Sequence, residues 1–368
     1  MKITKVDIYP IRLPLIKPFV IAYDSYPNMP SIIIKIHTDN GKVGYGESVP
    51  DEHVTGESFF STIALLKNNI IPKVIGLNPF DIEKIHQIMD KTVKNAPAAK
   101  AAIDIACYDI MGKASKQPLY NLIGGRYWDY LEIPHVLSIG EAKEMACEAK
   151  KAVENGFTTV KVKVGDSDLC KDIDRIVSIR QAVGRKIKLR IDANQGWVNS
   201  ANALTVLKDI EDCNIDWIEQ PILADDIRGH ARIRQQIKIP LMIDEGLHGS
   251  KEMLEIINTE AADMINIKLM KCGGIYPALK LVHQAKMANM YCQVGSMVES
   301  CIASLAGAHL SLAQSNIISN EMVGPLMFSK DLGKTDYQGN KLYLSKSPGL
   351  GVEINEEVLS KLAYDVVV

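Results

Sequence analysis

Short apolar runs alternate with longer amphipathic segments through the second part of the chain. The apolar runs, each of strand length, are EIPHVLS (132–138), TTVKVKV (158–164), KIKLRID (186–192), IDWIEQP (215–221), IPLMIDE (239–245), DMINIKL (263–269) and MYCQVGS (290–296). Segments with helical periodicity separate them at about 141–155, 168–183, 200–212, 226–236, 250–258, 275–288 and 300–314. This alternation predicts a parallel sheet with helical connections. A weaker strand near 317–323 would bring the total to about eight, the number that closes a barrel.

The first part of the chain has a different pattern, in which strands and helices are not interleaved. Residues 3–13 and 31–38 alternate like strands, and the Asn-Gly pair in TDNGKVGYGES is typical of a tight hairpin turn. Helical segments are predicted at 57–71, 79–92 and 97–115. We therefore expect an α+β domain that ends near the glycine pair at 124–125. The β and turn character of the C-terminal tail suggests that it packs back on this domain.

Composition and charge narrow the classes of function. The chain has 368 residues, of which 47% are hydrophobic and 23% charged, as is ordinary for a globular protein of about two domains. A formal net charge of -2 gives no general attraction to nucleic acid or to an anionic membrane, so neither partner is expected. No apolar run reaches the roughly 18 residues of a membrane span, and the N-terminus lacks a signal-peptide core. Seven scattered cysteines without a CxxC pair indicate neither disulfides nor a zinc site, so we expect a cytoplasmic protein.

Charged residues recur at nearly even spacing at the ends of the predicted barrel strands. They are Lys163, Asp192, Glu219, Asp244 and Lys268, separated by 24 to 29 residues. That spacing is about one strand, one helix and two loops, the repeat unit of a barrel whose catalytic groups gather at the carboxyl ends of its strands. The set combines three acids with two amines, which is the composition of a divalent-metal site between two proton-transfer groups. The sequence therefore predicts an enzyme.

The three acids are expected to lie side by side, because they follow successive strands. Asp192, Glu219 and Asp244 would supply only oxygen ligands, with no histidine or cysteine beside them, and such a set favours Mg²⁺, or Mn²⁺, over zinc. The alternative is that each acid caps the helix that follows it or pairs with a loop cation. Three acids in register between two lysines favour the metal site.

The lysines suggest proton transfer. Lys161 and Lys163 are two residues apart on one strand, so both side chains should point into the barrel. Lys268 would face Lys163 across the metal site, and the two amines would then lie on opposite sides of a substrate carbon. A base working near pH 7 to 8 needs a lysine pKa about three units below 10.4, a shift that corresponds to roughly 4 kcal/mol. A second lysine, a metal ion and partial burial could together lower the pKa that far. The alternative role, a surface or phosphate contact, is less favoured for a pair.

Longer motifs surround these residues. They are KVK (161–163), DANQGW (192–197), WIEQP (217–221), DE (244–245), NIKLMKCGG (266–274) and AKAAIDIACYDIMGK (99–113). On these motifs the chain resembles the enolase superfamily, and within it the muconate lactonizing enzyme subgroup, over almost its entire length. The resemblance implies an α/β fold, a modified TIM barrel of (β/α)7β type closed by an α+β capping domain formed by the N-terminal segment and the C-terminal tail. We expect the capping domain at 1–125, the barrel with the catalytic site at 126–325 and the returning C-terminal segment at 326–368.

The resemblance also implies a metal-assisted reaction. Asp192, Glu219 and Asp244 would hold Mg²⁺, which would bind a substrate carboxylate and stabilise the enediolate formed when the adjacent carbon loses its proton. This agrees with physical expectation, since a cation beside a developing negative charge is worth most in the transition state. Asn194 and Glu245 would support the metal ligands from behind.

The same resemblance assigns the lysines and separates two subgroups. Lys163 and Lys268 would be the acid/base pair, and Lys161 would contact the substrate carboxylate. The mandelate racemase subgroup instead uses a histidine on the seventh strand with an aspartate on the sixth. Here Gln293 and Lys268 stand at those places. That subgroup is therefore disfavoured.

The choice of reaction rests on further segments. GSMVES (295–300), VTGES (54–58) and GPL (324–326) make the chain similar to N-succinylamino acid racemases of the Bacillus type. We therefore expect a racemase that removes the α-proton of an N-acyl, and specifically an N-succinyl, amino acid. Dipeptide epimerase, muconate cycloisomerase and o-succinylbenzoate synthase remain alternatives, and a non-catalytic metal-binding barrel is the alternative of another class. Dipeptide epimerases resemble one another in an Asp-x-Asp pair after the last barrel strand, whereas this chain has Glu321-Met-Val there.

Specificity for the side chain is expected to come from capping-domain loops near 19–30 and 50–56. Asp51 and Glu52 in the second loop could receive a cationic side chain through charge-assisted hydrogen bonds, unless they form a solvated acidic turn. A small-molecule carboxylate is the expected partner, and related proteins are usually homo-oligomers. The remaining residues expected to bind substrate are His135, Ser296, Met297 and Glu299.

Overall fold

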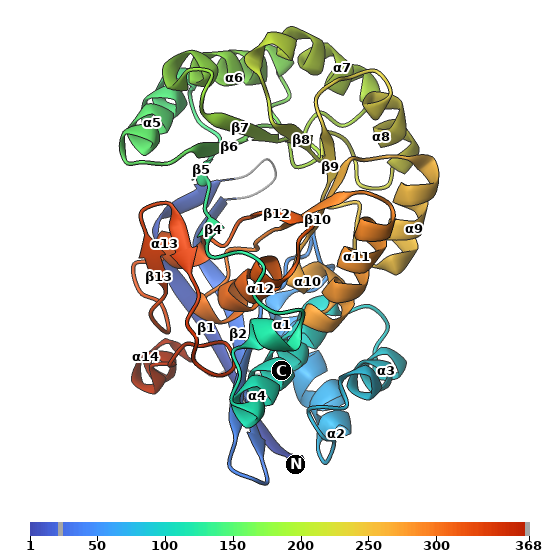
Figure 1. The fold of residues 1–368 in the computed structure, drawn as a ribbon, viewed down its shortest axis with the longest axis vertical. Coiled ribbons are helices and arrows are strands. Elements are labelled where there is room, and N and C mark those ends of the chain that lie inside the picture. Colours follow the sequence, from blue (N-terminus) through green and yellow to red (C-terminus); the bar gives the residue numbers. More distant parts are fainter. Residues whose placement is uncertain (21–24, 365–368) are drawn as a thin grey trace.

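The computed structural model describes residues 1–20 and 25–364, and its N-terminal part is an antiparallel sheet with helices (Figure 1). The strands follow one another in the order β1 (Ile3–Val20), β2 (Ser25–Thr38) and β3 (Val43–Ser48). The helical elements of this part are α1 (Phe59–Leu65), the π-helical turn η1 (Leu66–Ile70), α2 (Ile71–Val74), α3 (Ile82–Thr92), α4 (Pro97–Ser115) and the 3-10 turn η2 (Leu119–Leu122).

The first strand is longer than the sequence pattern predicted. It continues beyond residue 13 to Val20 through Pro14 and Pro18, and β2 begins at Ser25 instead of residue 31. Proline lacks the N–H that a ladder needs, but β1 is an edge strand of its sheet, where proline is tolerated. The pairing shifts register between Pro14 and Phe19, which accommodates the second proline.

Helix α4 is the core of the N-terminal part and packs closely on β3. A Cβ atom at Gly44 would lie 2.3 Å from the Ala106 carbonyl oxygen, and one at Gly46 would lie 1.9 Å from that of Ala102. The two glycines of the GYG segment are therefore needed for this close approach, beyond the hairpin turn that precedes them. Although α4 has 19 residues, neither it nor another helix within 1–20 and 25–364 combines the length and apolar character needed to cross a membrane.

The second part is a curved sheet of parallel strands with helices on its outer face (Figure 1). In order along the sheet the strands are β5 (His135–Leu137), β6 (Thr159–Lys163), β7 (Lys188–Asp192), β8 (Trp217–Glu219), β9 (Leu241–Ile243), β10 (Met264–Ile267), β11 (Tyr291–Val294) and β12 (Ile317–Asn320). The connecting helices are α5 (Ala142–Glu154), α6 (Leu169–Val183), α7 (Ser200–Asp209), α8 (Ile227–Arg234), α9 (Ser250–Thr259), α11 (Ile275–Met287) and α12 (Cys301–Ala313).

These elements confirm the predicted modified TIM barrel. The eight parallel strands are joined by seven long helices, and β12 is followed by the short helix α13 (Gly324–Met327) in place of an eighth long one, which is the (β/α)7β pattern. No backbone ladder joins β12 to β5 within the described residues. There the short strand β4 (Leu131–Glu132) lies beside β12, and the Asn320 side-chain amide donates a hydrogen bond of 2.9 Å to the Glu132 carbonyl.

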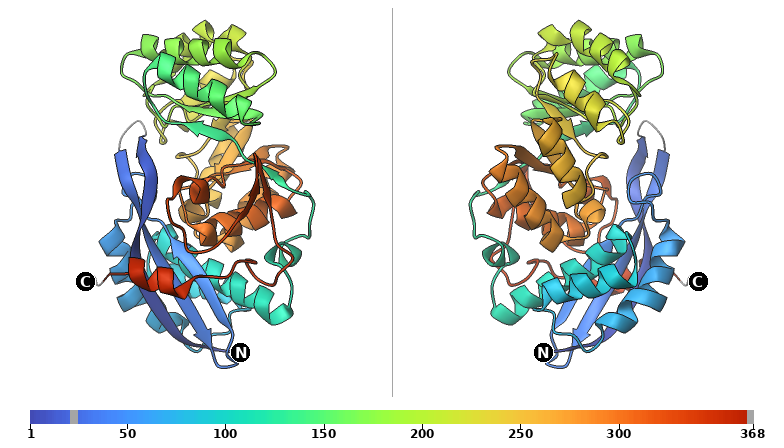
Figure 2. Two further views of the ribbon diagram at one scale, coloured as in Figure 1. Left: turned by 90° about the vertical axis from the view of Figure 1, so that its left-hand side faces the viewer. Right: turned by 90° about the vertical axis from the view of Figure 1, so that its right-hand side faces the viewer.

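The C-terminal tail runs from the barrel to the N-terminal sheet. Its strands β13 (Asp336–Gln338) and β14 (Lys341–Tyr343) form a small sheet with β4. Its last helix, α14 (Glu356–Leu362), packs against β1, as Figure 2 shows in its left-hand view. The tail thus contacts both parts of the molecule.

Two buried carboxylates fasten the N-terminal part to barrel helices. Glu47 on β3 accepts hydrogen bonds of 2.9 Å from the backbone N–H groups of Ser300 and Ala303 at the start of α12. Asp104 on α4 accepts one of 2.5 Å from the backbone N–H of Ile275 at the start of α11. The first N–H groups of a helix have no partner within it, so these contacts satisfy them and favour negative charge there. They hold the N-terminal sheet over the end of the barrel where the predicted site lies.

Candidate active site

The predicted acids and lysines meet at the carboxyl ends of neighbouring strands. Lys163, Asp192 and Glu219 are the last residues of β6, β7 and β8, and the ladder pairs the first with the second and the second with the third. Asp244 and Lys268 directly follow β9 and β10. All five residues are buried. Parallel pairing alone thus brings the five side chains to one rim of the sheet.

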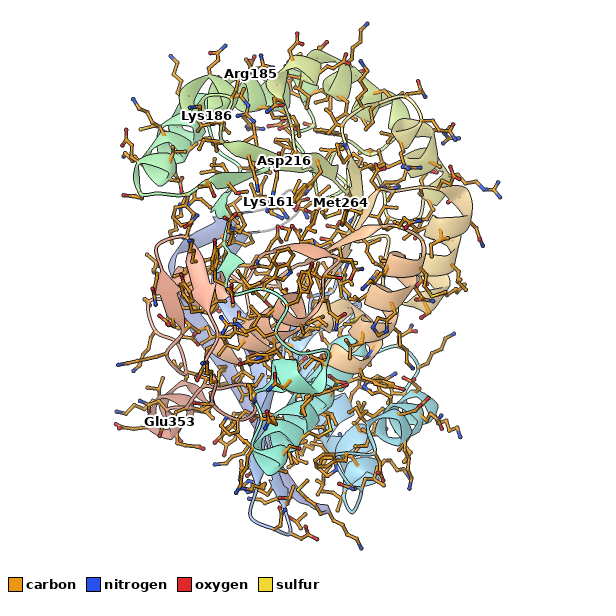
Figure 3. All side chains as sticks on the ribbon, in the orientation of Figure 1. Lys161, Arg185, Lys186, Asp216, Met264 and Glu353 are labelled. Atoms are coloured by element: carbon orange, nitrogen blue, oxygen red, sulfur yellow. The ribbon has the colours of Figure 1, made fainter. Side chains whose placement is uncertain are left out.

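The first two lysines contact the acids of β7 and β8. Lys161 lies inside the curved sheet (Figure 3), and its Nζ is 2.8 Å from both Asp192 Oδ2 and Glu219 Oε2. It also pairs with Glu321, which follows β12. The Nζ of Lys163 is 2.7 Å from Asp192 Oδ2 and 2.9 Å from the Asn194 side-chain oxygen. The ammonium groups of Lys161 and Lys163 therefore share the carboxylate of Asp192.

The other side of the site is built around Asp244. The Nζ of Lys268 lies 2.7 Å from Asp244 Oδ2, and that of Lys271 lies 2.5 Å from Asp244 Oδ1. Asn194 links the two halves, because its amide nitrogen donates a 2.8 Å hydrogen bond to Glu245 while its oxygen accepts from Lys163. Lys163 and Lys268 thus contact different acids, and their placement on opposite sides of a substrate carbon stays a prediction.

The ion pairs set the protonation of the acids. Burial raises the pKa of Asp192, but Lys161 and Lys163 lower it further, so the net pKa is below its ordinary value. Burial also raises the pKa of Asp244, but Lys268 and Lys271 lower it by more, so its net pKa is below the ordinary value as well. Asp192 and Asp244 are therefore carboxylates at neutral pH.

Glu219 and Lys268 behave differently from these two acids. Burial, together with the charge of Asp192, raises the pKa of Glu219 to about 8. Burial lowers the pKa of Lys268, but Asp244 and Glu245 raise it more, so it lies well above the usual lysine value. In this structure Asp244 thus stabilises the ammonium form of Lys268, whereas the sequence predicted a lowered pKa for a lysine base.

The acids fit a hard divalent cation by their chemistry, although lysines contact them in this structure. Within the described residues, no three acidic, histidine or cysteine side chains are already arranged as a metal cluster. Asp244 Oδ2 and Glu245 Oε2 are buried without a hydrogen-bond donor, although Lys268 lies within ion-pair distance of the first. Asp192, Glu219 and Asp244 end or follow adjacent strands, and carboxylate oxygens are the ligands that Mg²⁺ and Mn²⁺ prefer.

Three residues that the sequence analysis did not assign support the acids. Asn266 donates a 2.7 Å hydrogen bond to Glu219 Oε1, and Gln293 donates one of 3.3 Å to Glu219 Oε2. Lys271 reaches Asp244 from the short helix α10 (Leu269–Cys272). Asn266 could have been found from the sequence, because it stands two residues before Lys268 and its side chain is therefore expected on the same side of the chain. Lys271 follows Lys268 by about one helical turn, a spacing too common to mark a site.

A pocket that is partly open to solvent lies over the acids and is roofed by the N-terminal sheet. Lys161, Lys163, Asn194 and Lys268 line its floor. Among residues of the N-terminal part that line it are Phe19, Tyr26, Met29, Val49 and Asp51, and from the far side Ser296, Met297 and Glu321 contribute. The structure thus brings both lysines of the predicted acid/base pair to one pocket with Asp51, Ser296 and Met297.

Asp51 is held in place by its own loop. Its Oδ2 accepts a 2.7 Å hydrogen bond from the Tyr26 hydroxyl, and its Oδ1 accepts hydrogen bonds from the backbone N–H groups of His53 and Val54. This local turn directs the neighbouring Glu52 away, so that Glu52 is exposed and lines a separate surface cavity. The expected pair of acids in the pocket is therefore corrected to Asp51 alone.

Two other expected substrate-binding residues also lie outside the pocket lining. His135 alternates with the pocket-lining Val136 on β5, so its ring turns towards Phe157 and Glu148 on the helix side of the sheet. Glu299 is buried below the 295–300 loop, where Ser296 donates a hydrogen bond to it. Its position supports the loop rather than the substrate surface.

Glu299 makes the stability of the protein depend on pH. Burial raises the pKa of Glu299 to about 7 from 4.5, against a lowering hydrogen bond from Ser296. The folded chain therefore keeps a proton that the unfolded chain releases, so this group lowers stability progressively as pH rises from about 4.5 to 7. Urea unfolding of Glu299→Gln and the native protein should show the variant gaining up to roughly 3 kcal/mol of relative stability between pH 4 and pH 8. Parallel pH profiles for the two proteins would contradict this.

Comparisons with known proteins agree with this architecture. Residues 3–124 match the mandelate racemase/muconate lactonizing enzyme N-terminal domain, and residues 144–358 match the enolase C-terminal domain-like model. The chain is 56% identical to N-succinyl-L-Arg/Lys racemase of Bacillus cereus over 98% of both chains. The crystal structure of N-succinyl Arg/Lys racemase from that species has a TM-score of 0.97 at 55% identity and covers 99% of this chain and 98% of its own. A dipeptide epimerase of Enterococcus faecalis, complexed with Mg and the dipeptide L-Leu-L-Tyr, has a TM-score of 0.92 at 39% identity over 96% of this chain and 99% of its own.

Proposed function

Because this chain belongs to the mandelate racemase/muconate lactonizing enzyme family of the enolase superfamily, we propose that it racemises N-succinyl amino acids with cationic side chains. The observation that carries the proposal is that Lys163 and Lys268 line one pocket and pair with different acids, Lys163 with Asp192 and Lys268 with Asp244. The 56% identity to N-succinyl-L-Arg/Lys racemase supports the choice of substrate. N-succinyl-arginine and N-succinyl-lysine are the leading candidates.

Two lysines can invert a stereocentre by moving protons on opposite faces of one carbon. One lysine, in its neutral form, accepts the α-proton as the C–H bond breaks, and the other, as an ammonium, gives a proton to the opposite face. The roles exchange for the other enantiomer. Lys161, buried beside Glu219 and Asp192, would orient the α-carboxylate of the substrate. The roof formed by the N-terminal sheet would limit the access of water to the reacting carbon.

Asp192, Glu219 and Asp244 would hold Mg²⁺, for which Mn²⁺ could substitute. A bound divalent cation would supply electrostatic stabilisation of the charge that develops on the substrate carboxylate when the α-proton leaves. Asn266 and Gln293 would keep Glu219 oriented, and Asn194 would keep Glu245 and Lys163 oriented.

Proton exchange in D₂O tests the proposed function. N-succinyl-L-arginine incubated with the protein and Mg²⁺ should gain deuterium at its α-carbon and lose optical rotation. Mass spectrometry follows the first change and polarimetry the second. If no N-acyl amino acid in a panel of acyl groups and side chains exchanges its α-proton, the racemase proposal is wrong and a binding role is favoured.

Asp51 is proposed to select cationic side chains. Its carboxylate lines the pocket, and loss of one partner from a buried charge pair costs about 2 kcal/mol or more, equivalent to about 30-fold in affinity. Asp51→Asn should lower kcat/KM for N-succinyl-L-lysine by about 30-fold. For N-succinyl-L-norleucine, whose side chain is uncharged, kcat/KM should stay nearly the same. Asparagine retains the side-chain oxygen that accepts the loop N–H groups, so the turn is preserved.

Glu52→Gln is the matched control for Asp51→Asn. It removes the same charge one residue along, from a side chain outside the pocket lining. In this control, kcat/KM for N-succinyl-L-lysine and for N-succinyl-L-norleucine should each change by no more than about twofold. A similar loss in the two variants would mean that general electrostatic attraction, not a direct contact, selects the side chain.

Dipeptide epimerisation is a second candidate, favoured by the position of Glu321 in the pocket. An acid there could pair with the ammonium group of a dipeptide. However, Glu321 already pairs with Lys161, and a dipeptide ammonium would have to compete with that contact. Assay of the same preparation with L-Ala-L-Lys and N-succinyl-L-lysine decides between the two activities through the larger kcat/KM.

A further inference from the structure

A second cavity adjoins the pocket above the acids. The two share four apolar lining residues, Phe19, Val136, Val323 and Met327, so they are adjacent. The second cavity is also lined by a charged cluster of Lys17, His135 and Glu148. Lys17 Nζ lies 2.7 Å from Glu148 Oε1, and His135 Nε2 lies 3.4 Å from the same oxygen.

An N-succinyl substrate has two carboxylates, and the second one needs a partner of its own. A carboxylate enclosed by protein without a cation or hydrogen-bond donors is costly. The cations on the floor of the first pocket are Lys161, Lys163 and Lys268, and each already pairs with an acid of the site. The proposed reaction assigns these three to the α-carboxylate and the α-proton. They are therefore not available for the distal end of the acyl group.

Elimination among the lining residues leaves Lys17 and His135. No other lysine, arginine or histidine lines either cavity within the described residues. Residues 21–24, between the two first strands, read Ile-Ala-Tyr-Asp and carry no positive charge. The apolar residues shared by the cavities suit the two methylene groups of a succinyl chain, and Lys17 lines the second cavity but not the first.

We propose that the second cavity is the acyl subsite, in which Lys17, assisted by His135, binds the distal carboxylate of an N-succinyl group. The inference rests on the proposed racemase function and names the groups that recognise its acyl chain. The Lys17 ammonium has three N–H donors and its side chain is 65% exposed, so it can keep Glu148 and accept a second carboxylate. Glu148 then holds Lys17 beside the cavity.

Replacement of Lys17 by methionine tests the subsite with two acyl groups. Lys17→Met should lower kcat/KM for N-succinyl-L-lysine about tenfold, through a higher KM, and change that for N-acetyl-L-lysine less than twofold. His135→Gln should show a smaller loss with the same preference. Lys42→Met removes the same charge from an exposed position before β3 and should leave kcat/KM unchanged for both N-succinyl-L-lysine and N-acetyl-L-lysine. Equal losses for both acyl groups, or no loss for either, would overturn the proposal.

A binding measurement separates failure of the subsite from failure of the racemase function. N-succinylglycine has no stereocentre, so its affinity can be measured by calorimetry whether or not the protein racemises anything. The native protein should bind it at least about fivefold more tightly than N-acetylglycine, and Lys17→Met should abolish that difference. An unchanged difference in the variant would refute the role of Lys17 even if racemisation is confirmed.

Discussion

Alanine in place of Lys163 is expected to abolish racemisation, by about 10³-fold or more, while leaving α-proton exchange intact for one enantiomer only. Lys163 pairs with Asp192 and Lys268 with Asp244, and the proposed mechanism assigns each lysine to one face of the substrate carbon. Lys268→Ala should show the mirror pattern and retain exchange for the other enantiomer. Deuterium incorporation into separate L and D substrates, followed by mass spectrometry, measures both effects.

The two variants serve as controls for one another, because a general folding defect would reduce exchange of both enantiomers together. Melting temperatures of both variants show whether the fold is retained. If either variant exchanged both enantiomers equally, or if both variants lost the same enantiomer, the assignment of one lysine to each face would be wrong.

Glu219→Gln is expected to abolish stabilisation of the protein by Mg²⁺ and to reduce racemisation to background. Glu219 supplies one of three proposed anionic ligands, and even residues that only support metal ligands contribute about 10- to 100-fold to metal affinity. The fold should tolerate the change, because burial and the charge of Asp192 raise the pKa of Glu219 to about 8, so the structure already accommodates a neutral side chain there.

Thermal unfolding measures this effect without reference to activity. A ligand that binds only the folded state raises the melting temperature, so the native protein should melt higher as Mg²⁺ or Mn²⁺ is added. Glu219→Gln should melt at nearly the same temperature with and without the metal. Glu255→Gln, on the exposed face of α9, is the matched control and should respond like the native protein. A metal response retained in Glu219→Gln would remove Glu219 from the proposed ligand set.

The residues whose positions follow from strand pairing could be predicted from the sequence. Asp192, Glu219 and Asp244 end or follow adjacent strands, so period and register alone bring them together. The barrel itself was predictable for the same reason, since each unit repeats one apolar run and one amphipathic helix.

Residues whose direction depends on a loop could not be predicted in this way. Asp51 and Glu52 are neighbours in the sequence, but hydrogen bonds from the loop to Asp51 send the two side chains into different cavities. To place the His135 side chain, one must know which residues of β5 face the pocket, and this strand of three residues is too short to show an alternating pattern. Glu321 was recognised as a substitution in a motif, yet its contact with Lys161 joins strands on different parts of the barrel and has no local signal.

A crystal structure of the protein with Mn²⁺ and N-succinyl-L-arginine tests the central claim most directly. The account predicts an anomalous peak among the carboxylates of Asp192, Glu219 and Asp244, with the substrate α-carbon between the Nζ atoms of Lys163 and Lys268. A metal bound elsewhere, or an α-carbon reached by only one of the two lysines, would contradict it.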